Sequence, residues 1–220
     1  MLIIDTDPQS NATKNLYPGQ KADITIKDLF HGMDISKVIH ESVEAGLDII
    51  PSCKSFSVVE QELSTRLAGE KVLYKALKPI EQNYDVTIID TQPSIGLISV
   101  NALYASDEVI IPVYEDYAVD AMNQMVGTVY QVRQELEKEL IIGGILLTMY
   151  DPRTNLAKDV LKDLKTKYGS VVFDTMIHRD VNLAKCPRHN QSIFEYAPES
   201  AGAKAYEALT DELLVRWGMV

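Results

Sequence analysis

Residues 2–9 read Leu-Ile-Ile-Asp-Thr-Asp-Pro-Gln, and residues 86–93 read Val-Thr-Ile-Ile-Asp-Thr-Gln-Pro. Each stretch starts as a short, β-rich apolar run and passes through an aspartate into a turn that contains proline. Continuous apolar runs of this length are typical of strands buried on both faces of a parallel sheet. The two stretches therefore predict two strands of such a sheet, each with acidic side chains at its carboxyl end.

Similar apolar runs recur along the chain and alternate with helical patterns. Together they predict six strands, at residues 2–4, 47–50, 86–89, 109–113, 141–147 and 171–177. Apolar residues at helical spacing predict helices over 57–67, 70–82, 118–139, 155–168 (with Asn155 as N-cap) and 201–217. This alternation indicates an α/β fold with a mostly parallel sheet and helices on both faces. We see no linker or repeat, and expect one domain over residues 1–220.

The acidic residues at the ends of the first and third predicted strands form the main candidate site. The carboxyl ends of parallel strands open onto the ligand crevice of such a sheet, so Asp5, Asp7 and Asp90 should face one site. Converging carboxylates repel each other unless a cation lies between them, and Mg²⁺ with nucleotide phosphates meets that need. The alternative is that these aspartates only cap the turns that follow.

Composition excludes several classes of protein. The chain has 220 residues, 46% of them hydrophobic, and a formal net charge of −11, which opposes loose adhesion of the whole surface to DNA or anionic lipid. Cys53 and Cys186 are too few for a disulfide framework and lack metal-ligand spacing. The longest nearly uncharged apolar run, residues 140–149, is about half of what a membrane helix needs. We expect a cytoplasmic protein.

Charge is distributed unevenly. Residues 151–190 carry eight basic and five acidic side chains, a net charge of +3, which leaves −14 for the other 180 residues. Such asymmetry can confine polyanion binding to one face while the remaining surface repels it. The alternative is an ordinary solvated helix face.

Four blocks of the sequence, in this order, resemble the ParA/Soj partition ATPases, which are relatives of MinD. They are Asp-Thr-Asp-Pro-Gln-Ser-Asn-Ala-Thr at 5–13, Ile-Ile-Asp-Thr-Gln-Pro-Ser-Ile-Gly at 88–96, Leu-Thr-Met-Tyr-Asp-Pro-Arg-Thr-Asn at 147–155, and Tyr-Ala-Pro at 196–198 with the small residues that follow. The second block is similar to the family's Walker B strand. The resemblance covers nearly the whole chain and implies a P-loop NTPase-like fold of the ParA type.

The resemblance also implies roles for individual residues. Asp7 falls on the aspartate that orients the attacking water, Asp5 supports it, and Asp90 falls on the Walker B aspartate that holds Mg²⁺ through water. The residues implied to border the bound ATP are Met149, Asp151 and His178. The family's DNA contacts imply a basic surface made by Arg153, Lys158, Lys162, Arg179 and Arg188. The chain departs from the family at His178, where proline is usual, and at Asn182, where arginine is usual.

One part of the family pattern is absent from these 220 residues. Family members begin with a strand, a Lys-Gly-Gly-x-Gly-Lys-Thr loop and a helix, and no Gly-x-x-x-x-Gly-Lys-[Ser/Thr] pattern occurs here. That loop supplies the backbone N–H groups and the lysine that hold nucleotide phosphates. We therefore expect weak ATP hydrolysis or none. A start codon placed too late, a genuine relative without the loop and a deliberately chosen fragment are the three explanations.

The missing βα unit has a structural consequence as well. It contributes a central strand in the family, so its neighbours should be left with open edges.

The leading hypothesis is a chromosome or plasmid partition protein that, when intact, dimerises with ATP, binds DNA nonspecifically and is released by a ParB-like partner. It would then be nucleoid-associated. The alternative is a nonenzymatic ParA-like module that docks or dimerises with an intact ATPase.

Overall fold

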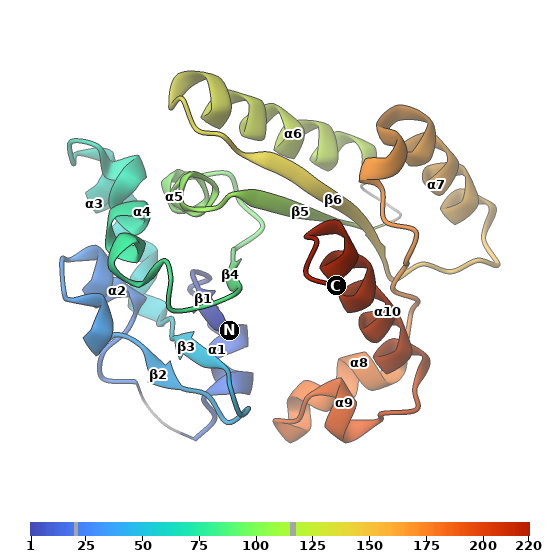
Figure 1. Cartoon of the computed structure of the whole chain (residues 1–220), viewed down its shortest axis with the longest axis horizontal. Coiled ribbons are helices and arrows are strands. Elements are labelled where there is room, and N and C mark those ends of the chain that lie inside the picture. Colours follow the sequence, from blue (N-terminus) through green and yellow to red (C-terminus); the bar gives the residue numbers. More distant parts are fainter. Residues whose placement is uncertain (20–21, 115–117) are drawn as a thin grey trace. The chain divides into compact units, whose positions relative to one another are not determined.

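The computed structural model describes residues 1–19, 22–114 and 118–220, and leaves out the side chains of residues 118–121. Its internal contacts divide the chain into two compact units (Figure 1). Unit 1 consists of Met1–Asp107 with Gln131–Leu140, and unit 2 of Glu108–Tyr130 with Ile141–Val220. Each unit is described by itself, and the single domain expected over residues 1–220 stays a prediction.

Unit 1 contains a four-stranded sheet in the order β2-β3-β1-β4. Its strands are β1 (Leu2–Asp5), β2 (His40–Glu41), β3 (Asp48–Ile50) and β4 (Thr87–Asp90). Strand β1 is parallel to both neighbours, with Leu2 opposite Asp48 on one side and Thr87 on the other, and only β2 is antiparallel. The predicted parallel strands at 2–4, 47–50 and 86–89 are therefore confirmed.

Short helices follow the strands of unit 1, and most of them pack on one face of its sheet. They are α1 (Asn11–Leu16), α2 (Ile26–Phe30), η1 (Ile35–Lys37), η2 (Lys54–Val58), α3 (Val59–Ser64), η3 (Gly69–Lys71), α4 (Val72–Leu77), η4 (Lys78–Ile80) and α5 (Leu97–Ala105). Leu2 and Ile4 belong to the same core cluster as residues from α2, α3, α4 and α5. The helices predicted over 57–67 and 70–82 are shorter and broken into pieces; Ala68 between them is left-handed (φ 53°), and a 3₁₀ turn with Pro79 near its start follows α4.

Unit 2 is built on two parallel strands, β5 (Glu108–Tyr114) and β6 (Ile141–Thr148). Its helices are α6 (Ala118–Glu135, shared with unit 1), α7 (Asn155–Tyr168), η6 (Gly169–Val171), α8 (Val181–Lys185), η7 (Cys186–His189), α9 (Ile193–Tyr196) and α10 (Ala201–Arg216). Helix α7 has its predicted bounds, but its N-cap is Thr154 and not Asn155, because the Thr154 hydroxyl accepts the Ala157 N–H at 3.2 Å.

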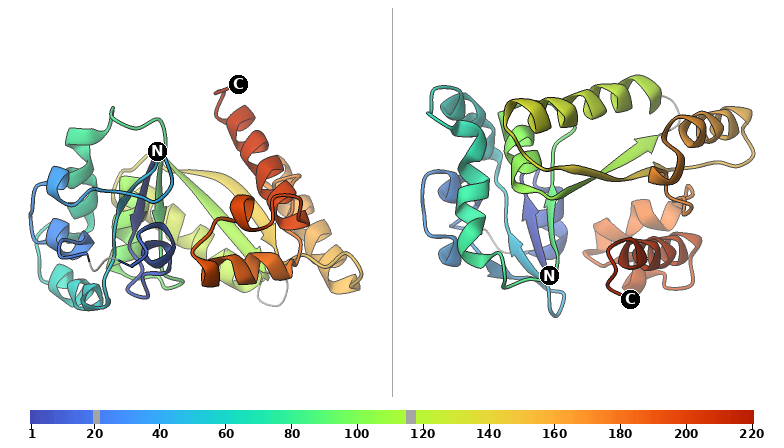
Figure 2. Two further views of the ribbon diagram at one scale, coloured as in Figure 1. Left: turned by 90° about the horizontal axis from the view of Figure 1, so that it is seen from below. Right: turned by 45° about the horizontal axis from the view of Figure 1, so that its top comes forward.

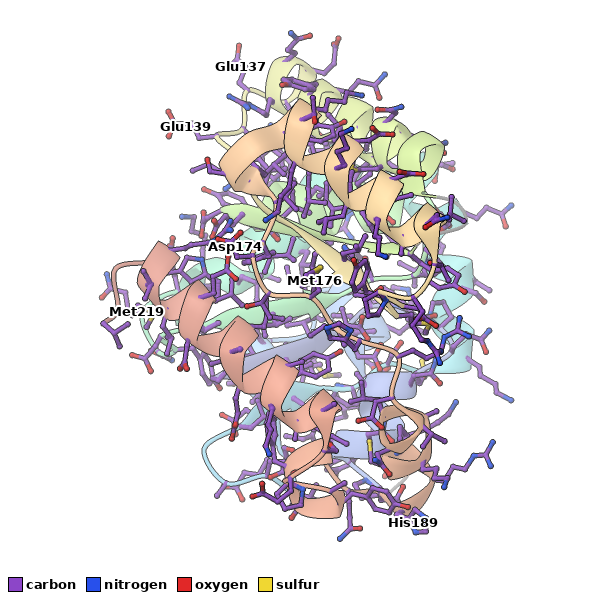
Figure 3. All side chains as sticks on the ribbon, turned by 90° about the vertical axis from the view of Figure 1, so that its right-hand side faces the viewer. Glu137, Glu139, Asp174, Met176, His189 and Met219 are labelled. Atoms are coloured by element: carbon purple, nitrogen blue, oxygen red, sulfur yellow. The ribbon has the colours of Figure 1, made fainter. Side chains whose placement is uncertain are left out.

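The segment predicted as a strand over 171–177 is extended without being a full strand. It touches β6 through one isolated parallel bridge, Ile145 with Val172, and a second bridge joins Tyr150 and His178 just beyond the two segments. Between them, the N–H groups of Asp174 and Thr175 donate to the Glu212 carboxylate of α10 at 3.0 and 2.9 Å. Asp174 lies beside α10 (Figure 3). This side-chain acceptor replaces a neighbouring strand, so the ladder is interrupted.

The two faces of β6 are both buried, as expected for a strand in a parallel sheet. Ile145 and Leu147 join a cluster with residues of α6 and α7, whereas Leu146 joins a cluster with Phe173 and Leu209 of α10. Figures 1 and 2 show α6 and α10 on opposite faces of the β5–β6 pair. Helix α10 is therefore docked through Leu209, as the sequence predicts for residues 201–217.

Three strands, β2, β4 and β5, pair with a single neighbouring strand among the described residues. Strand β4 pairs with β1, and β5 pairs with β6. The side chain of Ile88 in β4 is 45% exposed, although its sequence is typical of a buried strand. In the described parts of the chain, no helix combines the length and the apolar character needed to cross a membrane.

Candidate functional site

The carboxyl ends of β1 and β4 lie next to each other. Asp5 is opposite Asp90 in the parallel register. Beyond it, Thr6 donates both its N–H and its hydroxyl to the carbonyl oxygen of Asp90, at 2.9 and 2.7 Å. This double contact fixes the two strand ends relative to each other, where the sequence predicts the site.

The Asp5 side chain is turned into the protein. Asp5 is 0% exposed, and its carboxylate accepts three hydrogen bonds. The Asp7 N–H donates to Oδ1 at 3.0 Å, while the N–H and the hydroxyl of Thr13 donate to Oδ2 at 2.8 and 2.6 Å. Burial raises the pKa of Asp5 above its usual value, and the bonds from Thr13 and Asp7 oppose that effect. Asp5 thus holds the backbone of Asp7 in place from the buried side of the site.

Asp7 begins the turn that leads from β1 into α1. Its Oδ1 accepts the Gln9 N–H at 2.8 Å, and its carbonyl oxygen accepts the Ser10 N–H at 2.8 Å. Ser10 closes the turn with φ 56°. One oxygen of Asp7 therefore caps the turn, as the alternative interpretation expects, while Oδ2 makes no hydrogen bond to any residue that the structure describes.

Asp90 lies at the carboxyl end of β4, opposite Asp5. Loss of water around its carboxylate, and then the charges of Asp5 and Asp7, raise the pKa of Asp90. A cation would relieve this repulsion. Among the described residues, no three His, Cys, Asp or Glu side chains gather closely enough to bind a metal directly. The residues therefore fit Mg²⁺ held through water by one carboxylate and completed by phosphate oxygens.

The candidate nucleotide residues of unit 2 follow the carboxyl end of β6. Met149 is exposed and left-handed, with φ 52°. Asp151 accepts two hydrogen bonds from the Arg153 guanidinium, at 2.8 and 2.6 Å, and one from its backbone N–H at 3.0 Å, and these bonds hold the pKa of Asp151 well below its usual range. The His178 ring packs edge-on against Tyr150, with centroids 5.4 Å apart. These three residues therefore surround one strand end, and the charge of Asp151 is already paired.

The five basic residues predicted to bind DNA do not form one cluster. Lys158 and Lys162 are exposed on α7, Arg179 donates to the Tyr114 hydroxyl at 3.0 Å, and Arg188 is exposed in η7. Figures 1 and 2 show α7 and α8, the helix just before η7, on different sides of unit 2. Of the five, Arg153 is bound to the Asp151 carboxylate, whereas Lys158 and Lys162 form no ion pair with any residue that the structure describes.

Comparison with known proteins identifies the family. A family model described as an AAA domain matches residues 1–142. The sporulation initiation inhibitor protein Soj of Bacillus subtilis (strain 168) is 40% identical over 217 residues, which cover 97% of this chain and 85% of that protein. The chain belongs to the ParA/Soj family. The chromosome-partitioning ATPase Soj of Treponema pallidum (strain Nichols) is 37% identical over 219 residues, 99% of this chain and 86% of that protein.

A solved structure agrees with this assignment to the ParA/Soj family. Cobyrinic acid a,c-diamide synthase from Mycobacterium smegmatis, crystallised with an ATP analogue and magnesium, superposes with a TM-score of 0.83 at 29% identity. The match covers 99% of this chain and 82% of that one. The α/β fold of the ParA type predicted from the sequence is thereby confirmed.

Two residues of the site escaped the sequence reasoning. Thr13 lies within the first ParA/Soj-like block, but nothing in its position revealed that its hydroxyl reaches Asp5. Ser52, just after β3, donates its N–H to the Thr13 hydroxyl at 2.8 Å, and no sequence signal pointed to it. A threonine eight residues after a buried aspartate would have been the available clue.

Proposed function

We propose that this chain is a ParA-like chromosome or plasmid partition protein, which in its intact form works as an ATP-dependent, dimerising, DNA-binding switch. The names of its relatives, which include a chromosome-partitioning ATPase, support a partition role. The observation that carries the proposal is the pairing of Asp5 with Asp90 at adjacent strand ends, with Asp7 in the turn between β1 and α1. Acidic groups in this arrangement suit a magnesium nucleotide.

Each acidic residue would have its own task. Asp90 would hold Mg²⁺ through water, and the free oxygen of Asp7 would orient the water that attacks the terminal phosphate. Asp5 would keep Asp7 in place through its N–H. Bound Mg²⁺ would supply charge neutralisation for the phosphates. By the family resemblance, Met149, Asp151 and His178 would border the nucleotide base.

The partners would be DNA, a second copy of the chain and a ParB-like protein. Nonspecific DNA would contact Lys158 and Lys162 first, because both are exposed on α7, with Arg153, Arg179 and Arg188 adding positive charge nearby on unit 2. The acidic remainder of the chain would repel DNA, so binding would be local and would associate the protein with the nucleoid. We further propose that ATP hydrolysis is weak or absent in these 220 residues, which contain no Gly-x-x-x-x-Gly-Lys loop.

DNA retention tests the switch. The full-length gene product is passed over immobilised nonspecific DNA with Mg-ATP, with Mg-ADP and without nucleotide. We expect more of the protein to be retained with ATP than in the other two conditions. We also expect the Lys158→Ala/Lys162→Ala variant to be retained less than the unmodified protein. A Lys54→Ala/Lys75→Ala variant removes the same charge from exposed positions of unit 1 and should retain DNA like the unmodified protein. Equal retention in all nucleotide conditions would rule out the switch.

A second candidate function is a nonenzymatic module that pairs with an intact ATPase. The one-sided pairing of β4 and β5 favours it, because open strand edges are available to another chain. Calorimetric titration of the 220-residue chain with Mg-ATP, together with a phosphate-release assay, separates the two. Binding and turnover that depend on Asp7 would exclude the module, whereas a chain that neither binds nor hydrolyses ATP would support it.

A further inference from the structure

The hydroxyl of Thr13 connects three elements behind the acidic site. Thr13 lies in the first turn of α1, and its Oγ1 donates to Oδ2 of Asp5 in β1 at 2.6 Å. The same oxygen accepts the N–H of Ser52, which follows β3, at 2.8 Å. The backbone N–H of Thr13 donates to the same Asp5 oxygen at 2.8 Å. One side chain thus joins α1, β1 and the end of β3.

The direction of these bonds is fixed by chemistry. A backbone N–H can only donate, so the Thr13 oxygen accepts from Ser52 and directs its own proton to Asp5. With the Asp7 N–H on Oδ1, the buried carboxylate of Asp5 receives three donors and gives none. Bonds of this type to a charged acceptor are among the strongest in proteins. Both oxygens of the Asp5 carboxylate are therefore held by hydrogen bonds.

We propose that Thr13 is a positioning residue that acts through Asp5 on Asp7. This inference rests on the proposed function, because it gives Asp7 a task that requires a fixed orientation. The Asp5 carboxylate is the link, since Thr13 binds one of its oxygens and the Asp7 N–H binds the other. Loss of the hydroxyl leaves Oδ2 with a single donor, so the carboxylate can rotate and release the first residue of the turn.

Ser52 provides a matched control. Ser52 is 5% exposed, and its side-chain oxygen has no hydrogen-bond partner among the described residues. Ser52→Ala therefore removes a buried hydroxyl close to Thr13 but keeps the N–H that Thr13 accepts. A buried hydroxyl without a partner is destabilising, so its removal should leave the stability of the chain unchanged or raise it.

Amide hydrogen exchange, measured by NMR on the 220-residue chain without nucleotide, tests the proposal. Thr13→Val should raise the exchange rate of the Asp7 N–H by about tenfold or more, which is the scale expected for losing a charge-assisted bond. Thr13→Ala, which also lacks the hydroxyl but has a smaller side chain, should raise the exchange rate of the Asp7 N–H as much as Thr13→Val does. Thr13→Ser restores the donor and should stay within about threefold of the unmodified chain, as should Ser52→Ala. The N–H of Leu73, bound to a side chain elsewhere in unit 1, reports general loss of stability.

Two results would overturn the proposal. One is an unchanged Asp7 exchange rate in Thr13→Val and Thr13→Ala. The other is an equal rise for Asp7 and Leu73, which would mean that Thr13 only stabilises the fold. Because no nucleotide is present, these outcomes decide the inference even if the chain has no ATPase activity. Where the intact gene product does hydrolyse ATP, Thr13→Val should lower kcat with little change in KM, and Thr13→Ser should restore it.

Discussion

Asn101 gives the sharpest test of how unit 1 is held together around the acidic site. Asn101 is 0% exposed in α5, the helix that follows the loop after Asp90. Its Nδ2 donates to the carbonyl oxygens of Gly69 and Leu97 at 2.8 and 2.9 Å, and its Oδ1 accepts the Leu73 N–H at 3.1 Å. This side chain therefore joins α5 to the start of α4 and to η3.

Replacement by alanine leaves two backbone groups without their partner, the Gly69 carbonyl and the Leu73 N–H. A buried polar group left unpaired lowers the free energy of unfolding by about 1–3 kcal/mol, so Asn101→Ala should lose about 2–6 kcal/mol in total. The matched control is Asn83→Ala, the same change at an exposed position in unit 1. Surface substitutions of this kind stay within about 0.5 kcal/mol.

Urea unfolding followed by far-UV circular dichroism measures the effect in both units, and the fluorescence of Trp217 follows unit 2, because it is the only tryptophan in the sequence. Asn101→Ala should lower the midpoint of the dichroism transition with an unchanged slope, which shows a change in stability and not in the unfolded state. A loss as small as that of Asn83→Ala would refute the argument from unpaired groups.

Three further predictions concern other parts of the chain. Gly96→Ala should change the free energy of unfolding by less than about 1 kcal/mol, because the new methyl group would meet only the flexible end of the Glu60 side chain; a larger loss in chemical denaturation would contradict this. Arg216→Leu should lower the free energy of unfolding by about 2–4 kcal/mol, because it removes donors to three carbonyl oxygens and a cation–π contact at 4.1 Å. Chemical denaturation measures this free energy, and a change below about 0.5 kcal/mol would contradict the prediction. If Lys158 and Lys162 each neutralise one phosphate, replacing both by alanine should flatten the slope of log affinity for DNA against log salt by about 1.8, and an unchanged slope would remove α7 from the DNA surface.

The sequence predicts the strands of unit 1 because the two apolar runs that end in aspartate are too uniform for an exposed strand or a surface helix. The same reasoning fails for residues 171–177, where the apolar pattern is interrupted by Asp174 and Thr175. Their N–H groups bind Glu212 of α10, which is distant in the sequence. A local pattern cannot show that a side-chain acceptor from another helix takes the place of a neighbouring strand.

The candidate site is predictable to a similar extent. Periodicity and strand ends place Asp5, Asp7 and Asp90 together, because the carboxyl ends of parallel strands meet. The sequence does not show that Asp5 turns inward to Thr13, which depends on how tightly α1 folds back on β1. It also does not reveal that Arg153 forms a bidentate ion pair with Asp151, since this contact depends on the turn after β6.

The one-sided pairing of β4 has a practical consequence for anyone who purifies this chain. A strand edge that shows an isoleucine to solvent is a template on which a strand of another molecule can add, and repeated addition leads to aggregates. Ile88→Lys would place a charge on this strand and should raise the highest concentration at which the chain stays monodisperse in light scattering. The same exposed strand that could accept a partner would then also decide how well the isolated chain can be handled.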